Sequence, residues 1–182
     1  GDKSKTFKKI QDTFKKEIVV VRSSSVSEDG LINSAAGAYD SVLNVSVNNL
    51  SEIKKAVDVV LLSYKNKGEN HNDEVIVQKM ITNVSMSGVI FTHELNTGAP
   101  YYVINYDDKS GLTDTVTSGD GEYSNRTLYI HRNKKNVLRS DRFTSLLNAV
   151  KELEKVMGSE FLDIEFALGK DLKPYLLQVR SI

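Results

Sequence analysis

Four polar side chains near the carboxyl end of the sequence alternate with apolar residues. Asp163 and Glu165 fall in one such segment, and Gln178 and Arg180 fall in the next, after a turn at residues 169–174. Side chains alternate between the two faces of a β-strand, so each polar pair should share a face opposite an apolar one. The pattern predicts a hairpin with one buried face and one face that carries two carboxylates, an amide and a guanidinium.

This combination of groups suits a particular chemistry. Carboxylate oxygens bind a hard cation such as Mg²⁺, and the guanidinium fork of arginine binds phosphate. A site for a metal and a nucleotide requires both. The simpler alternative is that these are ordinary cross-strand pairs, each worth a few tenths of a kcal/mol to about 1 kcal/mol. The hairpin alone leaves both interpretations open.

Arg22 is a second candidate for phosphate binding. It ends a β-branched run at residues 17–22 and is followed by three serines at 23–25. Loops at strand ends hold binding residues on a rigid support, and charge-assisted bonds from a guanidinium to phosphate are strong. The alternative is that Arg22 only pairs with Glu28 or Asp29.

Two further segments contain candidate residues. Gly88 lies inside the apolar segment 87–92, where a glycine indicates a bulge or the close approach of another group. The alternative is a simple hairpin in which the glycine only serves packing. In the segment that begins at Val75, alternation places Lys79 on one side and Gln78 on the other, and either side could face a ligand.

The surrounding elements predict an α+β fold, a mostly antiparallel sheet with two long helices. Apolar spacing predicts helices over residues 50–64 and 142–157, with Asn49 and Asp141 as N-caps. Gly68 and Gly158 should end them. Strands are expected at 17–22, 39–45, 75–81, 86–92, 100–106, 112–118, 126–132, 161–168 and 175–180.

Composition removes several classes of function. The 24 basic and 24 acidic residues give no net charge, so nucleic acid or a membrane surface is not expected as a partner. Without cysteine there is no disulfide, thiolate nucleophile or cysteine-ligated zinc. The three histidines are scattered, and neither a membrane-spanning run nor a signal-peptide pattern is present. A cytoplasmic protein is expected.

The order of these segments resembles the nucleotide-binding domain of phosphoenolpyruvate synthase and pyruvate phosphate dikinase, the PEP/pyruvate-binding domain, which has an ATP-grasp fold. Each matching segment is short, but their common order from about residue 17 to residue 182 is specific. The matching segments are residues 19–24 with Glu28 and Asp29, 34–37, 43–45, 77–80, 87–92 with Thr97 and Gly98, 163–165 and 177–182.

The resemblance implies that Mg-ATP binds between two lobes and that a phosphoryl group passes to a histidine on a separate, swivelling domain. By position, Arg22 and Arg180 would act on the phosphates as catalytic residues, and Asp163 and Glu165 would bind Mg²⁺. The residues implied to contact ATP and its metal are Arg22, Lys65, Gln78, Asp163, Glu165, Gln178 and Arg180.

Several departures from the family pattern limit this expectation. Only twenty-one residues precede Arg22, so the family's upstream glycine-rich segment with its phosphate-binding lysine is absent. Lys65 stands where the family has an arginine, and Thr113 and Asp114 replace glycine and glutamate. A lysine lacks the planar fork of arginine. No histidine lies in a swivelling-domain motif, so the chain should not complete the reaction alone.

The expected organisation is therefore a lead-in at residues 1–16 and a partial ATP-grasp domain at 17–182. Because the chain begins with Gly1 and ends two residues after Arg180, we expect it to be a segment of a longer polypeptide. Its function would be that of an ATP-binding part of a larger phosphotransferase. The alternatives are a catalytically degenerate homologue that serves as a binding or regulatory module, or a structural domain that shares only the fold.

Overall fold

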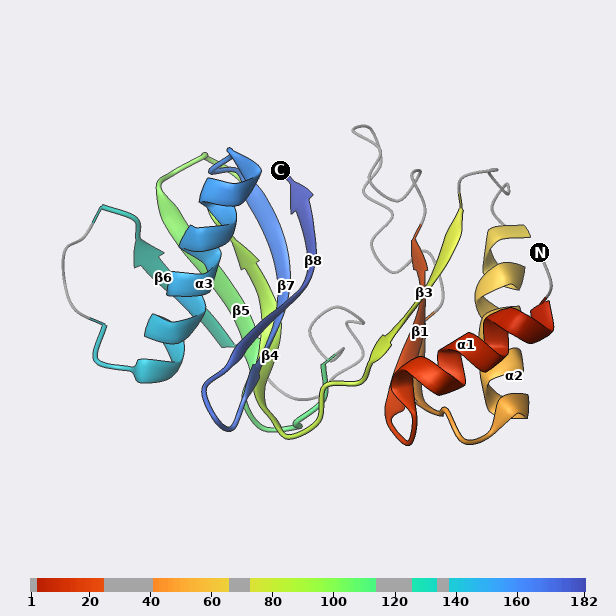
Figure 1. Ribbon diagram of the computed structural model, residues 1–182. Helices are drawn as coiled ribbons and strands as arrows, with labels where there is room; N and C mark the ends of the chain where they lie inside the picture. Colours follow the sequence, from red (N-terminus) through yellow and green to blue (C-terminus); the bar gives the residue numbers. More distant parts are fainter. Residues whose placement is uncertain (1–2, 25–40, 66–72, 114–125, 134–137) are drawn as a thin grey trace. The chain divides into compact units, whose positions relative to one another are not determined.

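The computed structural model describes residues 3–24, 41–65, 73–113, 126–133 and 138–182. The chain forms two compact units, Gly1–Met80 and Ile81–Ile182, each with its own sheet (Figure 1). All strand pairs in the described residues are antiparallel. None of the helices found there is long and apolar enough to cross a lipid bilayer.

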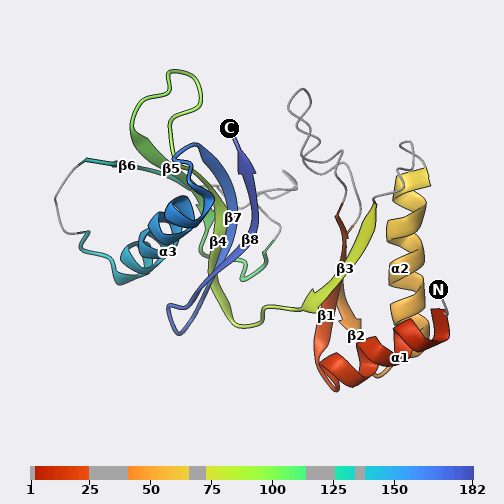
Figure 2. The ribbon, with the colours of Figure 1, turned by 45° about the horizontal axis from the view of Figure 1, so that its top comes forward.

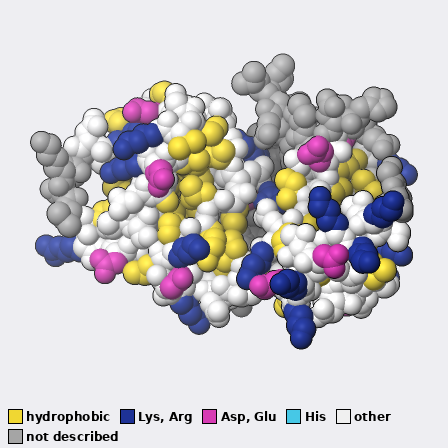
Figure 3. Space-filling model, viewed as in Figure 1, with side chains coloured by type: hydrophobic (Ala, Val, Ile, Leu, Met, Phe, Trp, Pro, Cys, Tyr) yellow, Lys and Arg dark blue, Asp and Glu magenta, His cyan; other side chains and the backbone are white. Residues whose placement is uncertain are grey.

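The first unit is a three-stranded sheet of order β2-β1-β3 with both helices on one face (Figure 2). Its core joins Val19 and Val21 of the central strand to Ile53 and Val60 of the longer helix. Basic side chains gather over the shorter helix (Figure 3). The elements of this unit are α1 (Lys3–Phe14), β1 (Ile18–Ser24), β2 (Ser41–Ser46), α2 (Leu50–Lys65) and β3 (Glu74–Lys79).

Asn49 caps α2 as the sequence predicts. Its side-chain oxygen accepts hydrogen bonds from the backbone N–H groups of Ser51 and Glu52 at 3.1 and 3.4 Å, and the Glu52 carboxylate accepts one from the Asn49 amide at 2.7 Å. Gly68, the expected end of this helix, lies outside the described residues.

The third helix of the structure, α1, was not predicted. Phe7, Ile10 and Phe14 lie on one stripe of α1 and contact the core of the first unit. Five of the twelve helix positions are lysine or aspartate, and no acidic residue stands in the first turn, so the apolar stripe is weak in the sequence. The described part of the fold is α+β with two antiparallel sheets and three helices, which corrects the expectation of one sheet with two helices.

The second unit is a five-stranded sheet of order β6-β5-β4-β7-β8. One helix, α3, covers one of its faces, and hydrophobic side chains gather along α3 and the neighbouring strand β8 (Figures 1 and 3). The elements are β4 (Val84–Phe91), β5 (Tyr101–Asp107), β6 (Arg126–His131), α3 (Asp141–Met157), β7 (Leu162–Gly169) and β8 (Pro174–Ser181).

Of the two predicted caps of α3, the structure confirms the C-terminal one and corrects the N-terminal one. Gly158 ends the helix in the left-handed conformation, with φ of 64°. Asp141 is not the N-cap: it is the first helical residue, and Ser140 before it takes the cap position without a side-chain hydrogen bond. The expected strand at 112–118 does not form at Leu112 and Thr113, and its remainder lies outside the described residues.

Arg132, just after β6, forms a buried ion pair with Glu154 of α3. Its Nη1 lies 2.6 Å from Glu154 Oε1, and its guanidinium stacks on the Tyr102 ring at 4.6 Å. The Tyr102 hydroxyl donates to the second oxygen of Glu154 at 3.1 Å. Burial, and then the negative charge of Glu154, raise the pKa of Tyr102 above its ordinary value, so this hydroxyl stays a donor.

Gly88 has a packing role in the ladder, because the group that approaches it is the backbone of the neighbouring strand β5. A Cβ at this position would lie 2.0 Å from the backbone oxygen of Asn105 and 2.8 Å from the Cα of Tyr106, both on β5. The irregularity in the β4–β7 ladder is elsewhere, between Val84 and Met86. Glycine at 88 therefore allows β4 to lie against β5.

We expect Gly88→Ala to lower the free energy of unfolding by about 2–3 kcal/mol, because the methyl group meets backbone that cannot move without breaking the ladder. Gly169→Ala is the matched control, since its Cβ would meet only the side-chain end of Asp171 at close range. Urea unfolding measures both variants. Equal loss of stability in the two would contradict this account of Gly88.

Candidate functional site

The β7–β8 hairpin brings the four predicted polar residues together. Asp163 pairs with Arg180 and Glu165 pairs with Gln178 across the ladder, as alternation predicts. Directly opposed residues in a ladder place their side chains on the same face. The two carboxylates, the amide and the guanidinium therefore form one group on the hairpin.

This group occupies the face of the sheet that α3 does not cover. The intervening residues Leu162, Ile164 and Phe166 are fully buried on the other face, in the core under α3. Within the second unit, α3 is the described helix, and it lies over the opposite face from the one that carries Asp163 and Glu165 (Figure 2). The hairpin thus has one apolar face in the core and one polar face available to a ligand.

Apolar neighbours surround the carboxylates on the β4 side. Glu165 lies beside Val89, and Asp163 lies beside Phe91. Burial raises the pKa of Asp163 above its ordinary range, although the positive charge of Arg180 lowers it in part. Within the described part of the chain, Asp163 Oδ1 is buried without a hydrogen-bond partner. A carboxylate oxygen in this state is suited to a cation.

Arg180 is held more loosely than its burial suggests. Its Nη2 lies 3.8 Å from Glu165 Oε1, which is an ion pair beyond hydrogen-bond distance. The side chains of Arg180 and Glu165 are 13% and 26% exposed. The guanidinium therefore keeps donors that an anion could use.

The residues present fit Mg²⁺ bound together with a phosphate ligand. No cluster of three or more histidine, aspartate or glutamate side chains that could hold a metal occurs in the described residues. Mg²⁺ commonly takes one or two carboxylates and completes its shell with water and substrate phosphates. Asp163 and Glu165 can supply those two carboxylates, and the unpartnered Oδ1 of Asp163 is the observation that favours them.

Arg22 and Gln78 lie in the first unit, on the face of its sheet away from the helices. Val20 pairs with Gln78, and Arg22 pairs with Ile76, so these four side chains share that outer face. Both predicted residues interact with other groups of the chain. Glu28, Asp29 and Asp114 lie outside the described residues.

Lys65 is exposed at the end of α2. It directly follows the buried Tyr64, for which the sequence predicted no functional role. The Tyr64 hydroxyl accepts the backbone N–H of Ser24 and donates to the backbone oxygen of Glu74, both at 2.7 Å. Tyr64 therefore fixes the end of α2 against the ends of β1 and β3. The sequence feature that could have indicated this role is the polar hydroxyl of a tyrosine at the end of an apolar helical stripe.

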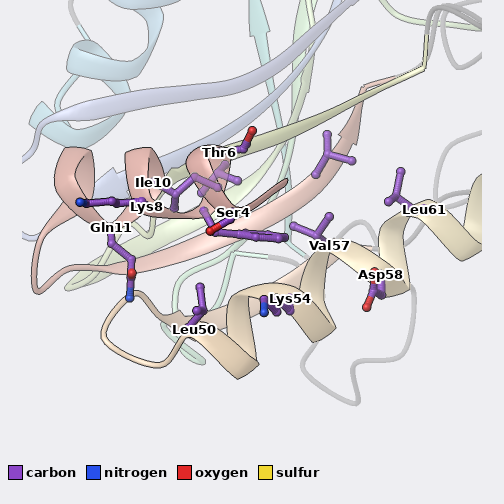
Figure 4. A pocket seen from close by; sticks show the side chains of 13 residues that line it. Ser4, Thr6, Lys8, Ile10, Gln11, Leu50, Lys54, Val57, Asp58 and Leu61 are labelled. Atoms are coloured by element: carbon purple, nitrogen blue, oxygen red, sulfur yellow. The ribbon is translucent and has the colours of Figure 1, made fainter. Parts of the chain in front are cut away.

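A pocket of about 900 Å³ opens in the first unit between α1, α2 and β3 (Figure 4). Its lining is largely apolar, and it includes Val75 and Val77 on the helix-facing side of β3. Gln78 and Arg22 face the other side of this sheet. The pocket is therefore separate from the predicted nucleotide contacts of its unit.

Comparison with known families identifies the class of domain. Residues 4–120 match the model of the family described as pyruvate phosphate dikinase, AMP/ATP-binding domain. The chain belongs to this family, as its resemblance predicted. The matched region contains Arg22, Lys65 and Gln78 but ends before the β7–β8 hairpin, so the interpretation of the hairpin depends on its own geometry.

A curated relative extends over more of the chain. The prodigiosin synthesizing transferase PigC of Serratia marcescens is 26% identical to this chain. The alignment is 204 residues long and covers 90% of this chain. The chain spans only 22% of the length of that relative. A solved structure, D-alanyl-alanine synthetase A of Vibrio cholerae, is 16% identical and covers 97% of this chain and 46% of its own, with a TM-score of 0.46.

Proposed function

We propose that this chain is the Mg-ATP-binding part of a larger phosphotransferase that resembles phosphoenolpyruvate synthase, with an ATP-grasp arrangement. The main support is the open face of the hairpin, where Asp163 and Glu165 oppose Arg180 and Gln178. The family is one of AMP/ATP-binding domains. A metal-bound triphosphate requires oxygen ligands for the metal and fixed donors for the phosphates, and these residues supply both.

In this proposal the hairpin acts by positioning and electrostatics. Asp163 and Glu165 hold Mg²⁺, while Arg180 donates to phosphate oxygens and Gln178 adds an amide donor. A Mg²⁺ ion held by these carboxylates would supply positive charge that offsets the negative charge developing during phosphoryl transfer. Fixed donors of this kind stabilise a transition state because they need no reorganisation during the reaction.

The remaining steps are assigned to other parts of the parent protein. The phosphoryl group would pass to a histidine on a separate swivelling domain and from there to its acceptor. This division agrees with the small share of the curated relative that the chain spans. Arg22, Lys65 and Gln78 remain predicted nucleotide contacts. The proposal includes a cytoplasmic location, where ATP is supplied.

A thermal melt with and without Mg-ATP tests the proposal. A ligand at 100 times its dissociation constant adds about 2.7 kcal/mol to stability. For a chain of this size that should raise the midpoint by roughly 5–10 °C. We expect the shift to require Mg²⁺ and to disappear in Glu165→Gln, because the amide cannot replace a charged metal ligand. Arg22→Ala should reduce it.

Glu152→Gln is the matched control, since Glu152 is exposed on α3 and far from any proposed role. It should keep the full shift. An unchanged midpoint of the parent chain at saturating Mg-ATP would contradict the proposal and favour a degenerate binding or regulatory module. The departures from the family pattern at Lys65, Thr113 and Asp114 are the sequence features that agree with that alternative.

A further inference from the structure

Thr92, directly after β4, is hydrogen-bonded through its backbone N–H and its hydroxyl to the segment that leads into β7. Its backbone N–H donates to the Leu162 oxygen at 2.9 Å. Its Oγ1 accepts the Leu162 N–H at 2.7 Å and donates to the Glu160 oxygen at 2.5 Å. Thr92 is fully buried. One side chain thus fixes the backbone on both sides of Phe161.

This attachment lies next to Asp163. Phe91 and Asp163 are direct partners in the β4–β7 ladder, so the Thr92–Leu162 contact is the next step along the same pair of strands. Because Asp163 Oδ1 has no hydrogen-bond partner in the described residues, the backbone that carries Asp163 must set the position of this carboxylate.

Two neighbours hold the same junction. Arg132 Nη1 donates to the Thr92 backbone oxygen at 3.0 Å. His93 Nδ1 lies 3.0 Å from the Glu160 oxygen, and its ring stacks on Phe161 at 4.3 Å between centroids. A carbonyl oxygen only accepts hydrogen bonds, so Nδ1 of His93 is the donor in its contact with Glu160. Besides the local bond from the Phe161 N–H to Ser159 Oγ, buried groups of distant sequence therefore fix the segment from Glu160 to Leu162.

We propose that Thr92 is a positioning residue for the carboxylate of Asp163: its hydroxyl holds the start of β7 so that Asp163 is directed at the metal. This inference rests on the proposed function of the hairpin. Thr92 would act through the backbone of Leu162 and would touch neither metal nor nucleotide. Residues that orient metal ligands from outside the coordination shell typically contribute 10- to 100-fold, as an order of magnitude, to metal affinity.

Thr92→Val and Thr92→Ser test this role. Valine keeps the branched shape and removes the hydroxyl, whereas serine keeps the hydroxyl. Calorimetry with ATP in the presence and absence of Mg²⁺ should show Thr92→Val weaker by about 10- to 100-fold only when Mg²⁺ is present. The dissociation constant of Thr92→Ser for Mg-ATP should be within about threefold of that of the parent chain, since serine keeps the hydroxyl that bonds to Glu160 and Leu162.

Amide hydrogen exchange at residues 161–165 gives a second readout that needs no ligand. Because Thr92→Val removes the hydroxyl that accepts the Leu162 N–H, exchange there should become about fivefold faster, and serine should restore the parent rate. If the parent chain binds Mg-ATP and the valine variant binds it equally well, the inference is overturned. Unchanged exchange in the valine variant also overturns it.

If the parent chain fails to bind Mg-ATP, the proposed function fails, and the exchange result still decides whether Thr92 fixes the start of β7. Urea unfolding of both variants, followed by the near-ultraviolet signal of the core tyrosines, identifies a general loss of fold. A valine variant that is folded, exchanges faster and has lost only its Mg²⁺-dependent affinity is the expected result.

Discussion

Arg132→Met is expected to lower the free energy of unfolding of the second unit by about 3–5 kcal/mol, the usual effect of removing one partner of a buried ion pair. The substitution leaves the buried Glu154 carboxylate without its cation, although the Tyr102 hydroxyl still donates to it, and removes the donor to the Thr92 backbone oxygen. A buried carboxylate without a cation is unstable because neither water nor an opposite charge compensates it. Urea unfolding monitored by hydrogen exchange in α3 measures the loss.

The first unit contains an exposed ion pair that serves as a control, because its N–O distance equals that of the buried pair. Lys79 and Glu17 are also 2.6 Å apart, but their side chains are 63% and 47% exposed, whereas those of Arg132 and Glu154 are 10% and 9% exposed. Lys79→Met should cost at most about 1 kcal/mol, as is typical of surface pairs. Similar losses for both lysine and arginine variants would contradict the role assigned to burial.

A double variant separates the missing charge from the missing packing. Arg132→Met combined with Glu154→Leu removes both charges, and replacement of a buried pair by apolar side chains is often neutral. We expect it to recover most of the stability that Arg132→Met loses. A double variant less stable than the single one would show that packing on Tyr102, and not the stranded carboxylate, dominates.

Asp163→Asn should have two opposite effects on the hairpin. Without ligand it should raise the free energy of unfolding by about 1 kcal/mol, because it removes a charge from a buried position whose oxygen lacks a partner. With Mg-ATP it should lose the stabilisation altogether. The loss of affinity should exceed the roughly 10- to 100-fold typical of residues outside the coordination shell.

The pH dependence of the first effect follows from the direction of the Asp163 pKa. Burial raises this pKa in the folded chain, and Arg180 offsets part of the increase. The folded state therefore favours the protonated acid. The contribution of Asp163 to stability is fully present below its unfolded pKa and is lost as pH rises through the folded pKa. The advantage of Asp163→Asn should thus be largest near neutral pH and shrink as pH falls towards about 4.

Thermal melts across this pH range measure the stability of Asp163→Asn relative to the parent chain. Asp58→Asn, at an exposed position of α2, is the control. The control should follow the parent chain at every pH. An Asp163→Asn variant that is less stable than the parent at neutral pH would show that the attraction of Arg180 outweighs burial. A variant that keeps the Mg-ATP shift would remove Asp163 from the metal site.

The hairpin was predictable because a strand has a simple period. Asp163 and Glu165 had to share a face whatever the rest of the fold, and one cross-strand register was enough to bring Gln178 and Arg180 opposite them. The cap at Asn49 was predictable for a similar reason, since its partners lie within four residues. The position of Gly88 inside a strand left a bulge, a close approach and simple packing open, and the structure identifies the β5 backbone as the neighbour that requires glycine.

The contacts that position the site were not predictable from local pattern. Thr92 holds Leu162 across 70 residues of sequence, and Tyr64 joins Ser24 across 40. Nothing near either residue indicates its partner. The helix α1 was missed because its three apolar side chains are spread among many lysines, and its stability comes from contact with the core of the first unit.

The strand order has a consequence for synthesis of the chain. All residues of the first core precede Ile81, so that core can form while the rest is still being translated. The second sheet is different, because its central strand β4 pairs on one side with β5 and on the other with β7, which is made after α3. Until residue 169 has emerged, one edge of β4 has no neighbour and is open to pairing with another chain. The segment that carries the carboxylates is thus also the one that closes this edge, and premature termination before it would leave an aggregation-prone product.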